Sequence, residues 1–412
     1  MQLESSPFTQ SLPRADLERV RAAMEAQGLD AVLPFSVENV RYLTGHAPAN
    51  PKLKGIFCAL FCADPSLPPA FVVGQFEEHW ARIRSRFDDV RTVQLWVEMD
   101  DLHDLETNRT TVVEKPVQFS REQTLAILRD LLDDRGLRGR RIGLERAMIP
   151  SALLAALEGE FTDIEFVDAT HLFEDLRAIK TPGEVEALRR ATQLAELGVR
   201  RIFLDADPRG KTVSQLRLEY QLAIMDAVRN DPATEGLEDM RVYISTGGGV
   251  GPIVSRNEIP VREGDVIWID CGVQIDGLAS DIGYTFSAGE PGPQTLRVAD
   301  ALAEGSQAGF ELLRPGTSMG EVFRACEGTI RKHGLPTYTR GHHGHAVGIG
   351  IGEQAPYVTD GEERPLLPGM VMAFERPYYV RGLGGFQMED NYVVTDDGIE
   401  IFNTLPTRLH TI

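Results

Sequence analysis

The chain is organised around a short stretch and its return, Asp265-Val266-Ile267-Trp268-Ile269-Asp270-Cys271-Gly272 and Gly277-Leu278-Ala279-Ser280-Asp281. Apolar residues fill the first arm, which is typical of a buried strand, and Asp276-Gly277 is a turn signal before the second arm. We therefore expect a β-hairpin. Its two-residue loop would place Asp270 and Asp281 on one face, opposite each other or one diagonal step apart, within roughly 8 Å.

Two carboxylates in one pocket need a partner. At an effective dielectric near 20, two unit charges about 4 Å apart repel by roughly 4 kcal/mol, so the pair must take up a proton, a base or a metal ion. The alternative is that one of the two aspartates lies at a turn or a sheet edge and faces water.

Length and charge exclude several classes of protein. The length of 412 residues exceeds what one hydrophobic core usually fills, so two domains are expected. Asp and Glu outnumber Lys and Arg by 62 to 42, and the net charge of -20 argues against a nucleic-acid or anionic-membrane surface. Residues 1–16 show no signal-peptide pattern and no apolar run is long enough for a membrane helix, which predicts a cytoplasmic protein.

The cysteines carry no metal or disulfide pattern. They are too few and too scattered for a disulfide framework, so we expect reduced core residues. The four are Cys58, Cys62, Cys271 and Cys326.

The first half of the chain alternates helix-like and strand-like segments, which predicts a small α/β domain over residues 1–175. The expected helices are 13–27, 37–43, 120–135 and 151–157, and the expected strands are 31–34, 55–62, 70–73, 141–144 and a short one around 166. Histidines, cysteines and acids do not cluster here. The acidic run from Asp100 to Glu106 indicates a solvated loop rather than a site.

A second domain is expected over residues 176–412. Thr181 can cap a helix that begins at Pro182, Glu184 can complete a capping box, and helical periodicity continues to about Leu204. Further helices are expected at 212–228, 293–313 and 319–333.

Three of the nine histidines fall within Arg340-Gly341-His342-His343-Gly344-His345. A lone histidine is a core residue by default, whereas a cluster flanked by glycines is equally compatible with metal ligation. Glu375 ends an apolar run and Glu389 precedes another. Each glutamate could be a strand-end surface residue, but buried glutamates are rare unless paired or metal-bound, so we expect both to join the two aspartates.

From Ile179 to about Pro406 the chain resembles the Xaa-Pro dipeptidase, aminopeptidase P and creatinase family of metallopeptidases. The resemblance rests on the order Asp, ten residues, Asp, then Gly-His, then Glu after an apolar strand, then Glu-Asp. It implies an α+β protein in which an N-terminal creatinase-like α/β domain precedes a C-terminal pita-bread catalytic domain. It also implies a homodimer.

The resemblance implies a site for two divalent metal ions. Asp270 would chelate one ion, Asp281 and Glu389 would bridge both, and His345 and Glu375 would hold the other. Catalysis is assigned to Glu375 and His345, with Glu375 taking the proton from a bridging water. Four carboxylates and one imidazole nearly balance two divalent ions and suit manganese first, then cobalt, zinc or iron. Two such ions would acidify a bridging water and polarise a carbonyl group, which would lead to hydrolysis of the adjoining C–N bond.

Two family histidines are missing. Peptidases of this family carry one seven residues after the ligand histidine, where this chain has Gly352, and another about seventeen residues before the first aspartate, where the stretch Pro252-Ile253-Val254-Ser255 has none. After Asp281, the usual Thr-Arg-Thr-Phe is Gly283-Tyr284-Thr285-Phe286. The metal ligands are thus complete while the machinery for proline peptides is not.

Polar residues near the ligands could bind a carboxylate or move a proton, although each could equally be structural. The candidate substrate-binding residues are Arg340, His342, His343, Tyr284 and Arg376. We therefore hold three hypotheses: an Xaa-Pro dipeptidase acting on small peptides, a non-peptidase hydrolase or lyase acting on a small zwitterionic amide or amidine, and an inactive binding module.

Overall fold

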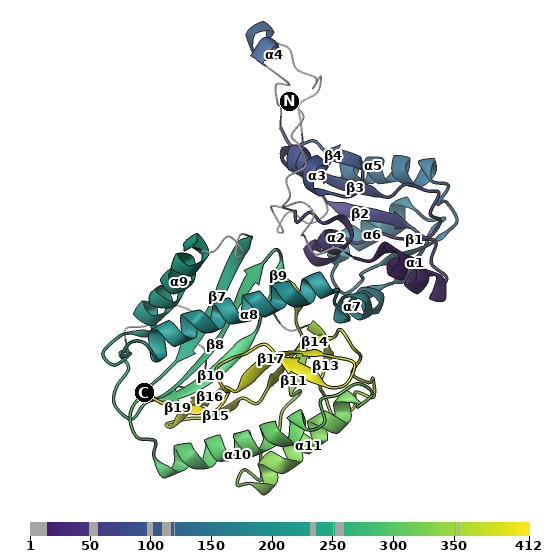
Figure 1. The fold of residues 1–412 in the computed structure, drawn as a ribbon. Coiled ribbons are helices and arrows are strands. Elements are labelled where there is room, and N and C mark those ends of the chain that lie inside the picture. The colour runs from purple at the N-terminus through teal and green to yellow at the C-terminus, as the bar shows by residue number, and fades with distance from the viewer. Residues whose placement is uncertain are drawn as a thin grey trace. The chain divides into compact units, whose positions relative to one another are not determined.

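The computed structural model describes residues 15–48, 57–96, 102–108, 117–118, 120–230, 236–249, 251, 259–350, 352 and 354–412. The chain divides into two compact units, Met1–Leu176 and Arg177–Ile412, a division one residue beyond the expected boundary. Figure 1 shows the elements of both units.

The first unit is built on a six-stranded mixed sheet in the order β4-β3-β2-β1-β5-β6. Its strands are β1 (Ala31–Val32), β2 (Cys58–Cys62), β3 (Ala70–Gly74), β4 (Asp89–Val93), β5 (Arg141–Leu144) and β6 (Glu165–Asp168). Its helices are α1 (Leu17–Ala26), α2 (Val37–Thr44), α3 (Glu78–Arg84), α4 (Leu102–Thr107), α5 (Arg121–Asp134) and α6 (Ser151–Glu160), with a 3-10 turn at Gln75–Glu77. The boundary of the unit falls within α7 (Thr170–Ala178). The expected α/β alternation is confirmed.

The acidic run of the first unit differs from expectation, and α3, β4 and α7 were not among the expected elements. The acidic run that was expected to be a loop contains the helix α4, whose described side chains are largely exposed. Asp104 lies in its first turn, where a negative charge stabilises the partial positive charge of a helix N-terminus. The acidic residues here therefore favour a short solvated helix, and Asp100 itself lies outside the described residues.

The second unit opens with the long helix α8 (Pro182–Phe203), which begins as the sequence predicted. The Thr181 hydroxyl accepts a hydrogen bond from the amide of Glu184, and the Glu184 carboxylate accepts one from the amide of Thr181. The other helices are α9 (Val213–Asn230), α10 (Pro293–Phe310) and α11 (Met319–Lys332).

An eleven-stranded sheet runs through the second unit, with its main path in the order β12-β9-β8-β10-β17-β14-β11-β13. Its strands are β7 (Leu237–Ser245), β8 (Val266–Ile275), β9 (Leu278–Ala279), β10 (Ile282–Ser287), β11 (Gly344–Ala346), β12 (Gly348–Ile349), β13 (Gln354–Tyr357), β14 (Val371–Glu375), β17 (Glu389–Val394), β18 (Ile399–Ile401) and β19 (Leu409–Thr411). A separate pair is formed by β15 (Tyr378–Val380) and β16 (Gly384–Phe386).

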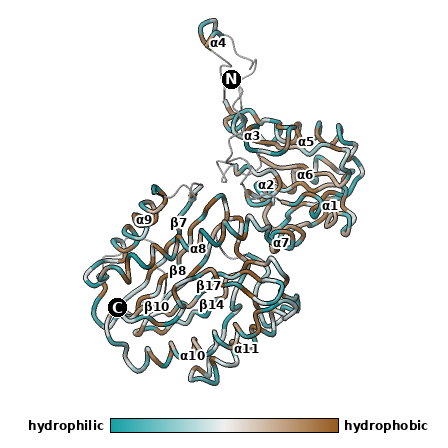
Figure 2. The backbone as a smooth tube through the Cα atoms, viewed as in Figure 1, coloured by the Kyte–Doolittle hydropathy of each residue, from teal (hydrophilic) through white to brown (hydrophobic). Residues whose placement is uncertain are grey.

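Two hydrophobic cores support this sheet. One packs α8 and α9 against β7, β8 and β10, and the other packs α10 and α11 against β11, β14 and β17. Figure 2 shows hydrophobic residues along the central strands and hydrophilic residues along the outer sides of the helices. The boundary between the two cores falls where β10 meets β17, at the pair Gly283 and Glu389.

The expected hairpin is present with the expected register. Ile275 pairs with Leu278 across the two-residue loop Asp276-Gly277, and both loop residues have positive φ, +50° and +84°. Glycine and aspartate tolerate that conformation in a tight turn whose twist matches the strands. Pairing of Cys271 with Ile282 keeps the same register further on, so Asp281 lies one diagonal step from Asp270.

Glycines let the strands and side chains approach closely at two points beside these aspartates. A Cβ on Gly272 would lie 2.0 Å from the carbonyl oxygen of Ser280, and a Cβ on Gly283 would lie 2.1 Å from Cγ of Gln387. Neither position has room for a side chain.

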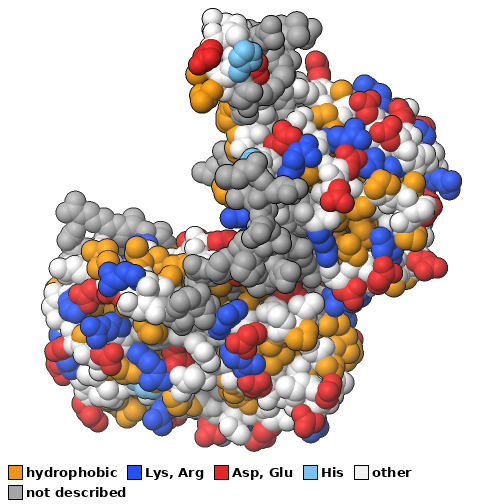
Figure 3. Space-filling model, turned by 45° about the horizontal axis from the view of Figure 1, so that its top comes forward, with side chains coloured by type: hydrophobic (Ala, Val, Ile, Leu, Met, Phe, Trp, Pro, Cys, Tyr) orange, Lys and Arg blue, Asp and Glu red, His pale blue; other side chains and the backbone are white. Residues whose placement is uncertain are grey.

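All four cysteines are free and buried, as expected. Among the described residues, none of the helices combines the length and apolar character that a membrane crossing requires. On the face drawn in Figure 3, acidic and basic side chains are interspersed, without a basic patch of the kind that binds nucleic acid.

We predict that Gly272→Ala destabilises the second unit, because the new methyl group must displace the backbone at Ser280. The expected loss in the free energy of unfolding is about 1–3 kcal/mol or more. Gly328→Ala is the matched control: it lies in α11, its Cβ meets nothing within 4 Å, and alanine in a helix should stabilise by about 0.5–1 kcal/mol. Urea unfolding followed by circular dichroism measures both, and equal stabilities would contradict the close approach.

Candidate metal centre

Two rows of paired residues cross the sheet and carry the site. The first row runs Tyr243, Asp270, Gly283, Glu389 and Glu375, on β7, β8, β10, β17 and β14. Residues paired in register point to the same face of a sheet, so Asp270, Glu389 and Glu375 share one face.

The second row lies two residues along the strands. Arg241 on β7 pairs with Gly272 on β8, and Asn391 on β17 pairs with Ala373 on β14, which pairs with His345 on β11. Asp281, in the bend between β9 and β10, lies between the two halves of this row. Five expected metal ligands from five separate segments thus meet on one face.

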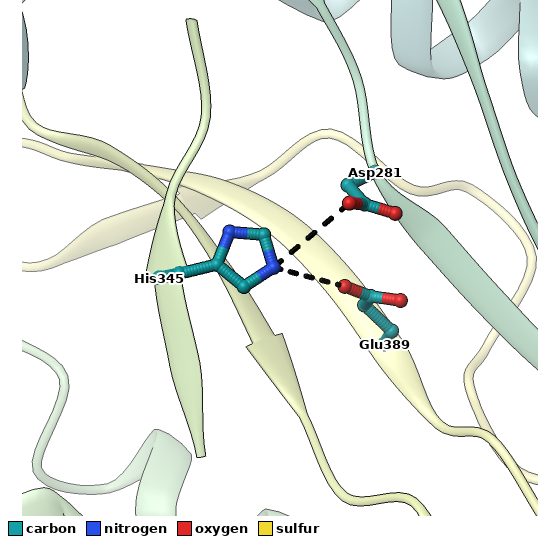
Figure 4. A group of neighbouring side chains, drawn as sticks. All are labelled: Asp281, His345 and Glu389. Carbon is teal, nitrogen blue, oxygen red and sulfur yellow. Dashed lines mark ion pairs between the residues drawn. The ribbon is translucent and has the colours of Figure 1, made fainter. Parts of the chain in front are cut away.

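Three of these ligands form a compact buried group, drawn in Figure 4. Asp281, His345 and Glu389 each offer one ligand atom, and these atoms lie within 4.8 Å of one another. Nε2 of His345 is 3.7 Å from Oε1 of Glu389 and 3.9 Å from Oδ2 of Asp281. These separations are too long for hydrogen bonds but fit an ion about 2.0–2.2 Å from each atom.

The imidazole of His345 is oriented for metal binding. Its Nδ1 donates a hydrogen bond to the carbonyl of Ala346 at 3.0 Å, so in the neutral ring the lone pair is on Nε2, which faces the two carboxylates. Burial lowers the pKa of His345, but Glu389 and Asp281 outweigh it and raise the pKa to about 10. This ring therefore requires a cation or a proton between itself and the acids.

Glu389 is the most enclosed acid of the group, with its side chain 3% exposed. Burial and then the charge of Asp281 raise the pKa of Glu389 well above its ordinary value. Its second oxygen, Oε2, accepts a hydrogen bond from Nε2 of Gln387 at 2.9 Å. Without a cation, this carboxylate holds its charge at a high electrostatic cost.

Glu375 lies beside two of the predicted substrate-binding residues. Its Oε2 is 3.3 Å from Nη2 of Arg340, and its Oε1 is 3.2 Å from Nδ1 of His342. The rings of His342 and His345 stand edge to face with centroids 6.0 Å apart. Arg340, His342 and Glu375 therefore form a polar group at the edge of the candidate ligands.

Arg241 is the functional residue that the sequence analysis missed. Its guanidinium pairs with Asp270 at 2.6 Å, and a second ion pair joins Nη2 to Oδ1 of Asp281. Burial lowers the pKa of Arg241, but Asp281 and Asp270 outweigh it and raise that pKa well above its ordinary value. Glu389 adds to the effect. Asp270 is therefore bound by an arginine.

Asn391 fixes the backbone at Asp281 from the other side of the site. Its Oδ1 accepts a hydrogen bond from the amide of Asp281 at 2.9 Å, and its Nδ2 donates to the carbonyl of Asp281 at 2.6 Å. This two-bond clamp aims the Asp281 side chain at the group. No sequence signal for it exists, because an Asn two residues after a Glu has many uses.

Two of the predicted substrate contacts lie away from the ligand group. Tyr284 is fully buried and donates a hydrogen bond to Glu196 of α8 at 3.1 Å. Arg376 is fully buried, pairs with Asp390 at 3.0 Å and donates a hydrogen bond to Ser306 of α10. Alternation along a strand explains both positions, because Arg376 follows Glu375 and Tyr284 follows Gly283, so each side chain faces the opposite side of the sheet.

His343 is also placed away from the group. Its ring is buried between Phe323 and Tyr338, with centroids 4.9 and 5.7 Å away, and its Nδ1 donates to the carbonyl of Glu375 at 3.3 Å. Burial lowers the pKa of His343 to about 3, so the ring is neutral. It behaves as a core histidine rather than as a substrate contact.

The position of one missing family histidine is open. Gly352 has a φ of +109°, and a Cβ built on it would meet no atom of the described residues within 4 Å. The other position, in the stretch 252–255, lies outside the described residues. Histidines are thus absent from the sequence at both positions, and space is available at the first.

The residues present fit one divalent cation. Asp281, His345 and Glu389 could hold it, with Glu375 within the same face, and these oxygen and imidazole donors suit manganese, cobalt, iron or zinc. An ion here would separate the lone pair of His345 from the two carboxylates and compensate the buried acids.

Comparison with known proteins identifies both units. A model described as metallopeptidase family M24 matches residues 186–396, more than half of the chain, and one described as the creatinase/prolidase N-terminal domain matches residues 17–179. The expected order of a creatinase-like domain followed by a pita-bread domain is thereby confirmed.

Individual relatives are more distant. The probable dipeptidase PepE of Mycobacterium tuberculosis (strain H37Rv) is 30% identical over 244 residues, which cover 58% of this chain and 62% of that relative. The Xaa-Pro dipeptidase of Lactobacillus helveticus is 29% identical over 60% of this chain and 66% of its own length. The aligned regions thus span less than two thirds of these relatives.

Solved structures share the fold over nearly the whole chain. An X-Pro aminopeptidase from Thermotoga maritima has a TM-score of 0.76 at 19% identity, covering 96% of this chain and 99% of its own. Dipeptidase PepE from Mycobacterium ulcerans has a TM-score of 0.75 at 22% identity, covering 100% of both chains. At these identities the likeness establishes the fold, and together with the family match it leads to one conclusion: the chain belongs to metallopeptidase family M24.

Proposed function

We propose that the chain is a metal-dependent dipeptidase that hydrolyses small peptides, with Xaa-Pro dipeptides as the first substrates to test. The observation that carries the proposal is the buried group of Asp281, His345 and Glu389, with Glu375 on the same face. Buried acids that face one another are costly, so their retention together favours a working metal site over an inert binding module. The names of the relatives, dipeptidase and Xaa-Pro dipeptidase, support the same reaction class.

The proposed mechanism assigns a task to each part of the site. A bound divalent cation would supply Lewis acidity toward the scissile carbonyl. Asp281, Glu389 and His345 would hold that cation, while Glu375 would accept a proton from the attacking water and pass it to the departing amine. Arg340, 3.3 Å from Glu375, would hold that carboxylate in place.

His342 is suited to relay this proton. It lies 3.2 Å from Glu375, and its side chain is 18% exposed, so it connects the site to solvent. Such a relay would give the site a proton path that does not need the two missing histidines.

In a second candidate function, the chain is a hydrolase or a lyase that acts on a small non-peptide zwitterion. The observation that favours it is the open space at Gly352, where the sequence lacks a family histidine. A substrate other than a proline peptide would explain that difference. The metal ligands and the role of Glu375 would be the same, and a substrate panel separates the two candidates.

We predict that proline is released from Xaa-Pro dipeptides in the presence of manganese, and that Glu389→Gln reduces the rate more than about 100-fold. Loss of an outer-shell partner costs a metal site up to about that much, and loss of a ligand should cost more. Glu400→Gln, a matched change at an exposed ion pair with Arg189, should leave the rate unchanged. Undiminished release by Glu389→Gln would refute the assigned site, and no release from metal-loaded protein would favour the non-peptide substrate.

We predict that His342→Gln lowers kcat by about 100-fold or more while metal content stays the same, because a positioned acid or base contributes roughly 100- to 10,000-fold. Steady-state kinetics and metal analysis on the same sample measure the two effects. A change in KM alone would assign His342 to substrate binding instead.

We predict that chelation destabilises the protein, because removal of the cation leaves Asp281 and Glu389 facing each other. At free metal about 100 times the Kd, returning manganese should add about 2.7 kcal/mol to the free energy of unfolding. Thermal unfolding with and without manganese measures the shift, and Glu389→Gln should show little response. An unchanged Tm after verified removal of metal would contradict this prediction.

A further inference from the structure

Arg241 occupies the part of the site that a second metal ion would need. Its guanidinium contacts Asp270 and Asp281, and its side chain is only 14% exposed. Together with Glu389, which also attracts it, these are the three carboxylates to which the family resemblance assigns one of the two ions. The planar fork of an arginine matches two carboxylates in this way.

The side chain of Arg241 crosses β8 at a glycine. Arg241 on β7 pairs with Gly272 on β8, so its guanidinium passes over a residue without a side chain. A Cβ there would lie 3.6 Å from Nη2 of Arg241. The arginine can therefore reach over β8 to both aspartates.

The two carboxylates expected to bridge a pair of ions each have one oxygen engaged by the protein. Asp281 directs Oδ2 toward His345 and pairs through Oδ1 with Arg241. Glu389 directs Oε1 toward His345 and accepts a hydrogen bond at Oε2 from Gln387. In both residues one oxygen faces the His345 side and the other is bound by a donor from this chain.

We propose that the guanidinium of Arg241 takes the place of one of the two metal ions, so that the site binds a single divalent ion between Asp281, His345 and Glu389. A one-ion site presupposes the metal-dependent function proposed above. It replaces the expectation of a dinuclear centre, in which Asp270 was to be a metal ligand.

Charge balance favours one ion. The four carboxylates, Asp270, Asp281, Glu375 and Glu389, carry -4 when ionised. Arg241 and Arg340 contribute +2 and one divalent ion +2, which gives zero, whereas a second ion would leave +2. A divalent ion about 4 Å from the guanidinium would also be repelled by its positive charge.

The test is the number of manganese ions bound per chain, measured by mass spectrometry of full-length protein after equilibration with manganese and removal of the free ion. We expect one ion in the unaltered protein and two in Arg241→Met, which keeps a similar length without charge. Arg324→Met, at an exposed ion pair with Asp360, is the matched control and should bind one. Two ions in the unaltered protein, or one in a folded Arg241→Met, would overturn the proposal.

A second pair of variants keeps the proposal testable if Arg241→Met fails to fold. Asp270→Asn should still bind one ion, because Asp270 holds the arginine, whereas Asp281→Asn should bind none or bind weakly. A fall from two ions to one in Asp270→Asn would overturn the proposal. Electron paramagnetic resonance provides an independent readout: uncoupled manganese supports one ion, and a spin-coupled pair overturns it.

These measurements use no substrate, so the two proposals can fail separately. Protein that binds one ion but cleaves no peptide overturns the dipeptidase function alone. Protein that binds two ions and cleaves peptides overturns the one-ion site alone.

Discussion

The second unit holds four carboxylates on one face of its sheet, and the residues around them must compensate this concentrated negative charge. Carboxylates of Asp270, Asp281, Glu375 and Glu389 meet there, and each unbalanced pair would cost several kcal/mol at this degree of burial. The surrounding residues offset that electrostatic cost with positive charge and hydrogen-bond donors. Strand register, the close approach of backbones at glycines, and the clamp on the Asp281 backbone then hold the acids where those partners can reach them.

Much of this arrangement could be predicted because its signals are local. A two-residue turn with aspartate and glycine sets the parity of the hairpin and hence the diagonal relation of its two aspartates. A capping box marks the start of α8. Alternation within a strand would also have excluded Tyr284 and Arg376 from the site, since each immediately follows a residue that faces it. Proximity in sequence was given more weight at these two residues than the direction of the side chain.

Other features could not be predicted because they depend on pairing between distant segments. Arg241 precedes Asp270 by 29 residues, and only the register of β7 against β8 places it opposite a glycine. Its charge gave no signal, since arginines on strands are commonly solvent-facing. Asn391 likewise acts on a backbone 110 residues away. Family membership limits the chemistry to a class, whereas these pairings determine how this chain performs it.

The seam between the two cores has a consequence for folding and motion. In the described chain, β10 and β17 pair through Gly283 and Glu389 alone, so cohesion across the seam relies on side-chain bonds such as those of Asn391 and Thr285. The side-chain bonds across this seam join segments that lie far apart in the chain, 110 residues apart for Asn391 and Asp281. Such long-range closure is slow and comes late. Because Asp281 and Glu389 lie on opposite sides of the seam, a cation held between them would join its two sides.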